Sequence, residues 1–137
     1  MSLLILLAFP IISIGQNNDI VEKFISSLIK DSSLTTSKVF LTERCVKGKR
    51  LIPLDKSLLM LRKRIIDAKS YKVLLYKEIE KSPDILKANS KDRDLISVIK
   101  IVEQNNKIQY IYVLKKGKLI DSFSVILKGG NEIVSWE

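Results

Sequence analysis

The chain has 137 residues, and its 24 lysine and arginine residues outnumber 15 aspartate and glutamate residues to give a formal net charge of +9. A chain of this length predicts one domain. It contains no histidine and one cysteine, which excludes Ser-His-Asp and Cys-His catalysis, histidine-bearing zinc sites and an intrachain disulfide. Because 46% of the residues are hydrophobic and 28% are charged, we expect a folded, basic domain.

The N-terminal part begins with an unbroken apolar run at residues 3–12. This run is too short to cross a membrane, which takes about 20 residues, and Ser13 and Gly15 give the small-x-small pattern of a signal-peptide cleavage site. We predict that residues 1–15 are a signal peptide and that residues 16–137 are a single exported domain, periplasmic or secreted, with no transmembrane span. The alternative is that the run forms a buried strand or helix.

The next part of the chain has the apolar spacing of helices. One helix is predicted over residues 18–30, and a second, shorter helix across Val39, Phe40 and Cys45 that ends before Gly48. Pro53 opens a third, strongly amphipathic helix. The residues predicted to share the apolar side of this third helix are Leu58, Leu59, Leu61, Ile65 and Ile66.

After Ser70 the apolar period changes from 3.6 to 2, which is typical of strands. The predicted strands are residues 71–79, 95–103, 108–114, 119–127 and 132–136, and residues 81–94 are predicted to be a polar loop. Short connections join only antiparallel neighbours. We therefore expect the α+β class, with N-terminal helices packed on a curved antiparallel sheet of four to five strands.

The fourth predicted strand carries apolar residues on both of its faces. Leu119, Phe123, Val125 and Leu127 alternate onto the face that also carries Asp121. We expect this face to meet the third helix and Phe123 to be buried in the core. The opposite face of the sheet is also apolar, so it either encloses a pocket or docks on a partner.

The order of helices followed by hairpin-linked strands, with residues 115–136 as the final hairpins, resembles the cystatin-like or nuclear-transport-factor-2-like α+β cone. The resemblance is architectural and covers residues 18–137. It implies either a small enzyme, such as an isomerase or dehydratase, or a ligand-binding or accessory domain. The enzymes of this fold usually place an Asp, His or Tyr inside the cone, and this chain lacks histidine.

The clearest candidate binding residues are the basic cluster of Arg44, Lys47, Lys49 and Arg50. With the net charge of +9 it predicts contact with an anion or an acidic partner, and ordinary solvated surface is the alternative. A second cluster consists of Arg62, Lys63 and Arg64. Export would keep the protein away from nucleic acid, so the expected partner is a protein or an anionic component of the cell envelope.

Tyr110 and Tyr112 lie on one face of the third strand, and together with Asp121 they are candidates for lining a pocket. Core packing is the alternative interpretation of the tyrosines, because aromatic residues favour strands for reasons unrelated to ligands. No residue spacing indicates a metal site or a cofactor, and no catalytic residue is assigned.

These features favour a non-enzymatic, exported binding or accessory protein of the bacterial cell envelope that recognises an anionic or apolar ligand or a protein partner. One alternative is a small cone-fold enzyme with Asp121 as the base and a tyrosine as donor, for which a raised pKa of Asp121 would be evidence. Another is a periplasmic immunity or inhibitor protein that blocks an acidic toxin or enzyme. The oligomeric state stays open.

Overall fold

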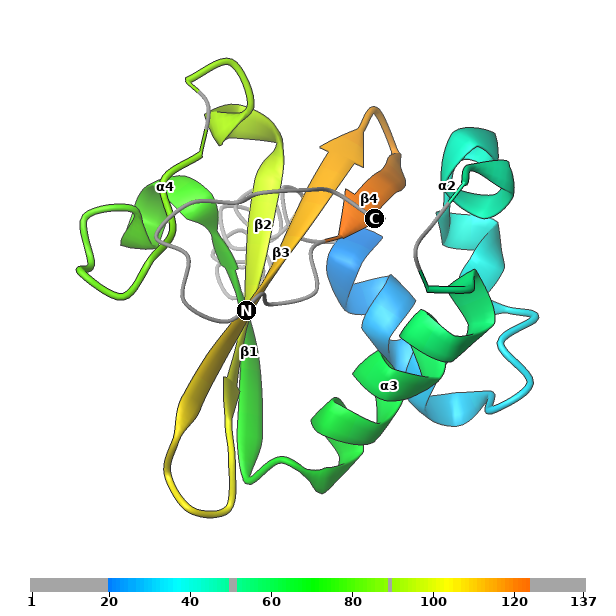
Figure 1. Ribbon diagram of the computed structural model, residues 1–137, viewed down its shortest axis with the longest axis horizontal. Coiled ribbons are helices and arrows are strands. Elements are labelled where there is room, and N and C mark those ends of the chain that lie inside the picture. The colour runs from blue at the N-terminus through cyan, green and yellow to red at the C-terminus, as the bar shows by residue number, and fades with distance from the viewer. Residues whose placement is uncertain (1–19, 50–51, 89, 124–137) are drawn as a thin grey trace, which may run out of the picture.

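The computed structural model describes residues 20–49, 52–88 and 90–123. The predicted signal peptide, the predicted fifth strand and the end of the predicted fourth strand lie outside these residues. Helices precede a four-stranded antiparallel sheet, which confirms the α+β class, and Figure 1 shows how the helices and the sheet are arranged. None of the helices within the described residues is long and apolar enough to span a membrane.

The helical part consists of a helix at residues 20–30, the 3-10 helix η1 (Ser37–Phe40), α2 (Glu43–Lys47) and α3 (Leu54–Asp67). The single short helix predicted across Val39, Phe40 and Cys45 is therefore wrong. Two helices form because Leu41 between them is extended and bridges Ile120 of the sheet. Thr42 then caps α2, and its Oγ1 accepts a hydrogen bond from the Cys45 N–H at 3.1 Å.

The apolar side of α3 is narrower than predicted. Leu58, Leu61 and Ile65 are buried, whereas Leu59 and Ile66 are 46% and 47% exposed. Neighbouring residues on a helix lie about 100° apart around its axis, so the one stripe that faces the sheet excludes these two positions. The amphipathic character of α3 is confirmed, but Leu59 and Ile66 do not belong to its buried side.

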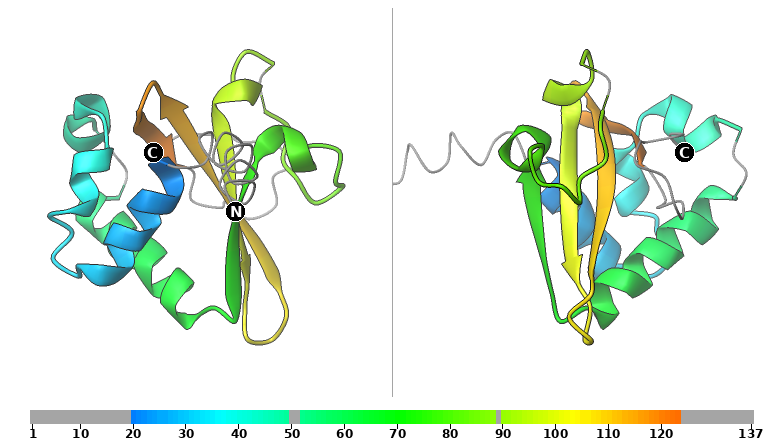
Figure 2. Two further views of the ribbon diagram at one scale, coloured as in Figure 1. Left: turned by 180° about the vertical axis from the view of Figure 1, so that it is seen from behind. Right: turned by 60° about the vertical axis from the view of Figure 1, so that its left-hand side comes forward.

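The sheet consists of β1 (Ser70–Leu75), β2 (Ile96–Val102), β3 (Ile108–Lys116) and β4 (Leu119–Phe123), in the order β1-β2-β3-β4 with all neighbours antiparallel. Helix 20–30 and α3 bury their apolar residues against one face of it. Figure 2 shows these helices on one side of the sheet and α4 on the other. The main core contains Phe24, Leu28, Leu58, Ile65, Ile99, Ile111 and Phe123.

The first strand is shorter than predicted, because α4 (Tyr76–Ile79) replaces its second half. The Glu78 side chain accepts a hydrogen bond from the Leu75 N–H at 2.9 Å, which satisfies a backbone donor where the strand turns into the helix. Tyr76 is buried, and its hydroxyl donates to the Leu86 carbonyl and accepts from the Ala88 N–H, both at 2.9 Å.

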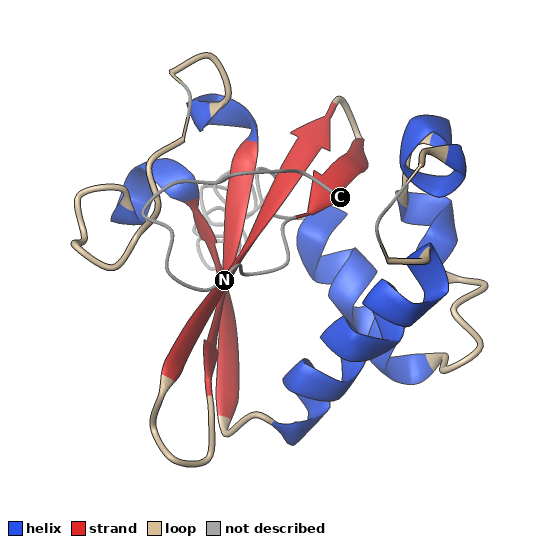
Figure 3. Cartoon of the chain, in the orientation of Figure 1, coloured by secondary structure: helices blue, strands red, loops and turns tan. Residues whose placement is uncertain are grey.

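The long segment between α4 and β2, drawn mostly as loop in Figure 3, covers part of the second sheet face. Ile85 from this segment is buried with Tyr76, Val98 and Tyr112 in a second, smaller core. The Tyr112 hydroxyl accepts a hydrogen bond from the Leu86 N–H at 2.9 Å. We expected the second face to enclose a pocket or to dock on a partner. At the α4 end of the sheet, residues of the chain itself cover this face instead.

A β-bulge interrupts the pairing of β3 with β4. Leu114 pairs with Ser122 but the next residue, Lys115, pairs with Ile120, so Asp121 is an extra residue in β4. A bulge of this kind shifts the alternation of side chains by one position and redirects the extra side chain.

Because of the bulge, the predicted assignment of side chains to the two faces of the fourth strand is wrong. Phe123 is 2% exposed and lies in the main core with α3, as expected, but Leu119 is 37% exposed and Ile120 is fully buried. Leu119 and Phe123 therefore do not share a face. Val125 and Leu127, which were assigned to the same face, lie outside the described residues.

Candidate functional site

Asp121 is held by the beginning of α2 instead of standing beside the tyrosines. Its Oδ1 accepts a hydrogen bond from the Thr42 hydroxyl at 2.8 Å, and Arg44 donates from Nη2 to Oδ2 at 2.7 Å and from Nε to Oδ1 at 3.1 Å. The Asp121 side chain is only 12% exposed. Its position follows from the bulge, which turns this extra residue toward α2.

This arrangement decides the protonation state of Asp121. The hydrogen bonds from Arg44, and to a smaller extent the one from Thr42, lower the pKa of Asp121 below its ordinary value, although burial opposes the shift. An enzyme that used Asp121 as its base was expected to show a raised pKa. The pKa of Asp121 is lowered instead. Asp121 acts here as a structural anion that joins β4 to α2.

The predicted basic cluster has partners inside the protein at two of its positions. Arg44 binds Asp121, and Lys47 forms an exposed ion pair with Glu43 at 2.8 Å. Lys49 is exposed, and Arg50 lies outside the described residues. Anion binding by this cluster stays a prediction, and two of its cations have a neighbouring carboxylate that would compete with the anion.

Tyr110 and Tyr112 belong to the second sheet face. Tyr112 is 1% exposed within the second core, and Tyr110 packs against that core from a partly buried position. Burial raises the pKa of both hydroxyls. The structure thus brings the two tyrosines together, but the polar partners of Asp121 are Thr42 and Arg44, from the helical side.

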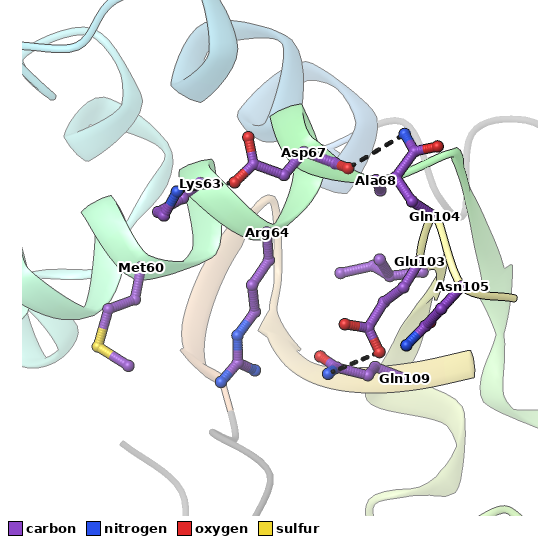
Figure 4. Close-up of a pocket in the computed structure, with 10 residues that line it drawn as sticks. Met60, Lys63, Arg64, Asp67, Ala68, Glu103, Gln104, Asn105 and Gln109 are labelled. Atoms are coloured by element: carbon purple, nitrogen blue, oxygen red, sulfur yellow. Dashed lines mark hydrogen bonds and ion pairs between the residues drawn. The ribbon is translucent and has the colours of Figure 1, made fainter. Parts of the chain in front are cut away.

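The described residues also form a hollow of about 530 Å³ between the C-terminal half of α3 and the β2–β3 turn, which we call the α3 hollow. This volume lies in the usual range for small-molecule sites. Figure 4 shows the side chains that surround it. Its lining residues are Met60, Lys63, Arg64, Asp67, Ala68, Ile101, Glu103, Gln104, Asn105 and Gln109.

The second basic cluster is divided among three different roles around α3. Arg62 donates from Nε to the Leu28 carbonyl at 3.0 Å and from Nη2 to the Ile29 carbonyl at 3.1 Å, so it caps the end of helix 20–30. Lys63 pairs with Asp67 at 2.8 Å on the exposed side. Only Arg64 reaches into the α3 hollow with no ion pair or hydrogen bond to any described residue.

The opposite wall of the α3 hollow is acidic and polar. Gln109 donates from Nε2 to Glu103 Oε2 at 3.3 Å, which fixes the orientation of its amide. The reverse orientation would place two acceptor oxygens against each other. In the observed orientation Gln109 Oε1 is buried and receives no hydrogen bond from the described residues. The hollow therefore has a cation on one wall and hydrogen-bond acceptors on the other.

The position of Gln109 in the sequence is a sign of this wall, although Gln109 is not among the residues predicted to form a site. Gln109 occupies the same alternating set as Ile111 and Val113, so it is a polar residue on an otherwise buried face of β3. The position of Arg64 opposite Glu103 had no such sign, since it depends on how α3 crosses the sheet. No group of three or more His, Cys, Asp or Glu within the described part of the chain could hold a metal ion.

Comparisons with known proteins identify no relative of this chain. No protein-family model matches it, and no curated protein and no solved structure is significantly similar to it. The α+β fold and the geometry of the α3 hollow are therefore the basis for a function.

Proposed function

We propose that this chain is a non-enzymatic binding protein and that its ligand occupies the α3 hollow. The ligand has an anionic group, a hydrogen-bond donor and an apolar part. As in the expectation from sequence, we infer that the protein is exported to the cell envelope, on the basis of the apolar run at residues 3–12 and the small residues that follow it.

The proposed function depends on Arg64, a cation in the hollow that has no partner among the described residues. Arg64 is a partly buried residue that lines the hollow and has no ion pair or hydrogen bond among the described residues, although its guanidinium carries five donors. Removing such a cation from water is unfavourable unless an anion compensates it. A carboxylate is the natural counterpart, because it accepts two parallel hydrogen bonds from guanidinium.

The other walls specify the rest of the ligand. Glu103, already oriented by Gln109, presents a carboxylate that can accept a hydrogen bond from an ammonium or hydroxyl group. Met60, Ile101 and Ala68 add apolar surface to the lining of the hollow. A small amphoteric molecule with an apolar substituent, such as an amino acid or a short peptide, satisfies all of these requirements.

Binding is favoured over catalysis because the one residue proposed as a base is already engaged. Asp121 is ion-paired with Arg44, which lowers the pKa of its carboxyl and leaves it a weaker base. A relationship to the cystatin-like or nuclear-transport-factor-2-like proteins belongs to this proposal too. It is supported by helices that precede and cover an open antiparallel sheet.

Three matched probes test the proposed ligand class. Leucine carries both charged groups, 4-methylpentanoate lacks the amine, and 3-methylbutylamine lacks the carboxylate. Ligand-observed NMR, which detects weak complexes, should show binding of leucine and a loss of about tenfold or more in affinity for each analogue, because each leaves one polar wall without a partner.

Variants on α3 and the facing wall locate the site. Arg64→Gln should abolish the advantage of leucine over the amine, and Glu103→Gln should abolish its advantage over the acid. Lys56→Gln removes a positive charge from an exposed position of the same helix and should bind leucine as the unmodified protein does. If leucine does not bind, or if Arg64→Gln binds it unchanged, the α3 hollow does not have this function.

A further inference from the structure

A row of basic and hydroxyl-bearing side chains crosses the second sheet face, away from the α3 hollow. Lys72 of β1 pairs directly with Lys100 of β2, and Lys100 pairs with Tyr110 of β3. Residues that are directly opposite on antiparallel strands project from the same face. Lys72, Lys100 and Tyr110 therefore form one line across three strands, which we call the lysine row.

The lysine row is unusual in its charge. Two lysines directly opposite each other repel, and sheets normally pair opposite charges at such positions. Yet no described carboxylate forms an ion pair with Lys72 or Lys100. Burial, and after it the charge of Asp84, raises the pKa of Tyr110 in the same row. The sheet thus retains an unfavourable pair where a neutral residue would be less costly.

The surroundings leave the lysine row accessible. Lys72 is exposed, and Lys100 and Tyr110 are partly buried. The second core, around Tyr76 and Tyr112, covers the face next to the row, at the α4 end of the sheet. On the other side of the row, Ile108 is 47% exposed. An anion can therefore approach the row from solvent, with apolar side chains on both sides of it.

We propose that the lysine row binds a phosphate monoester. Such a group carries a charge of about −1.5 to −2 near neutral pH, which balances two ammonium groups, whereas a carboxylate would balance only one. Its three terminal oxygens can accept hydrogen bonds from Lys72, Lys100 and the Tyr110 hydroxyl. The monoester belongs either to a soluble phosphorylated molecule or to the headgroup of a lipid such as phosphatidic acid.

The thermal unfolding midpoint provides the first test. Inorganic phosphate, compared with chloride at equal ionic strength, should raise the midpoint of the unmodified protein and of Lys118→Gln, which removes an exposed lysine from the β3–β4 turn. Lys100→Gln should lose this response. Because it also removes a like-charge repulsion, its midpoint in chloride should equal or exceed that of the unmodified protein. Lys72→Gln repeats the test at the more exposed end of the row.

Direct binding then identifies the source of the phosphate. Glycerol 3-phosphate measured by calorimetry represents soluble monoesters, and vesicles of phosphatidylcholine with phosphatidic acid represent the lipid. Whichever probe binds, Lys100→Gln should weaken it by about tenfold or more, and Lys118→Gln should not. Equal responses of the three proteins, or no response to any phosphate probe, would overturn the assignment. The α3 hollow would be unaffected, since it shares no residue with the lysine row.

Discussion

Replacing Asp121 with alanine should remove the side chain that ties β4 to the start of α2. The Thr42 hydroxyl and the Arg44 guanidinium both donate to this carboxylate, at 2.8 Å and 2.7 Å. Thr42 also caps α2, so its orientation affects the helix as well as the strand. We expect a stability loss that is larger than an exposed ion pair alone would cause.

The expected size follows from the exposure of each partner. A hydrogen bond to a charged group contributes about 1.5–3 kcal/mol, and an exposed ion pair contributes about 0.2–1 kcal/mol. The bond from Thr42 to Asp121 is only partly buried, which favours the lower end of the first range. Arg44 is 62% exposed, so solvent screens its attraction to Asp121. Together these contacts predict that Asp121→Ala lowers the free energy of unfolding by about 2 kcal/mol.

The loss should depend on pH in a defined direction. Arg44 lowers the pKa of Asp121 in the folded protein, so the folded state binds a proton less readily than the unfolded state does. The stabilisation is then fully present above the unfolded pKa of about 3.9 and is lost as the pH falls through the lower, folded pKa. Asp121→Asn keeps an acceptor for Thr42 but has no charge, so its difference from the unmodified protein should shrink below about pH 4.

Urea denaturation at neutral and acidic pH measures both effects. Asp84→Asn is a suitable control, because it removes an exposed carboxylate elsewhere on the protein. Equal urea midpoints for Asp121→Ala and the unmodified protein at neutral pH would refute the stabilising role of this contact. A difference between Asp121→Asn and the unmodified protein that persisted unchanged in acid would refute the electrostatic part of it.

Two other predictions concern the β-bulge and export. Phe123→Ala should lower the free energy of unfolding by about 3–5 kcal/mol, because it empties a core position, whereas Leu119→Ala should cost less than about 1 kcal/mol. Similar losses in urea denaturation would show that the two residues share a face and that β4 has no bulge. N-terminal sequencing of the protein recovered from fractionated bacterial cells should begin at Gln16. An uncleaved chain in the cytoplasm would contradict a signal peptide at residues 1–15.

The elements that sequence analysis located well are those with a local periodic signal. Helix 20–30, α3 and the strands β2 and β3 all follow from apolar spacing, and the order of helices before strands gave the α+β class. The predictions failed where specific hydrogen bonds, and not the spacing of apolar residues, decide the local conformation. Leu41 extends because it bridges Ile120, and the first strand ends at Leu75 because Tyr76 and Glu78 make new hydrogen bonds.

For the candidate sites, too, local features were predicted and contacts between distant residues were not. The sequence indicated the basic residues, the tyrosines and Asp121, since these can be read from residue type alone. It placed Arg44 in an anion site and Asp121 in a pocket, although the two residues bind each other across 77 positions of the chain. It grouped Arg62, Lys63 and Arg64 as one cluster, although Arg62 binds helix 20–30, Lys63 pairs with Asp67, and Arg64 lines the α3 hollow without a partner among the described residues.

Apolar periodicity predicts the class of the fold and the approximate position of most of its helices and strands, because it depends on which neighbouring side chains must avoid water. Which charges neutralise each other, and which remain available to a ligand, depends on how distant parts of the chain meet. One extra residue in β4 directs Asp121 toward Arg44, and the register of β1 with β2 places Lys72 opposite Lys100. Charge pairing requires atoms within a few ångströms, and chain folding, not sequence separation, determines that distance.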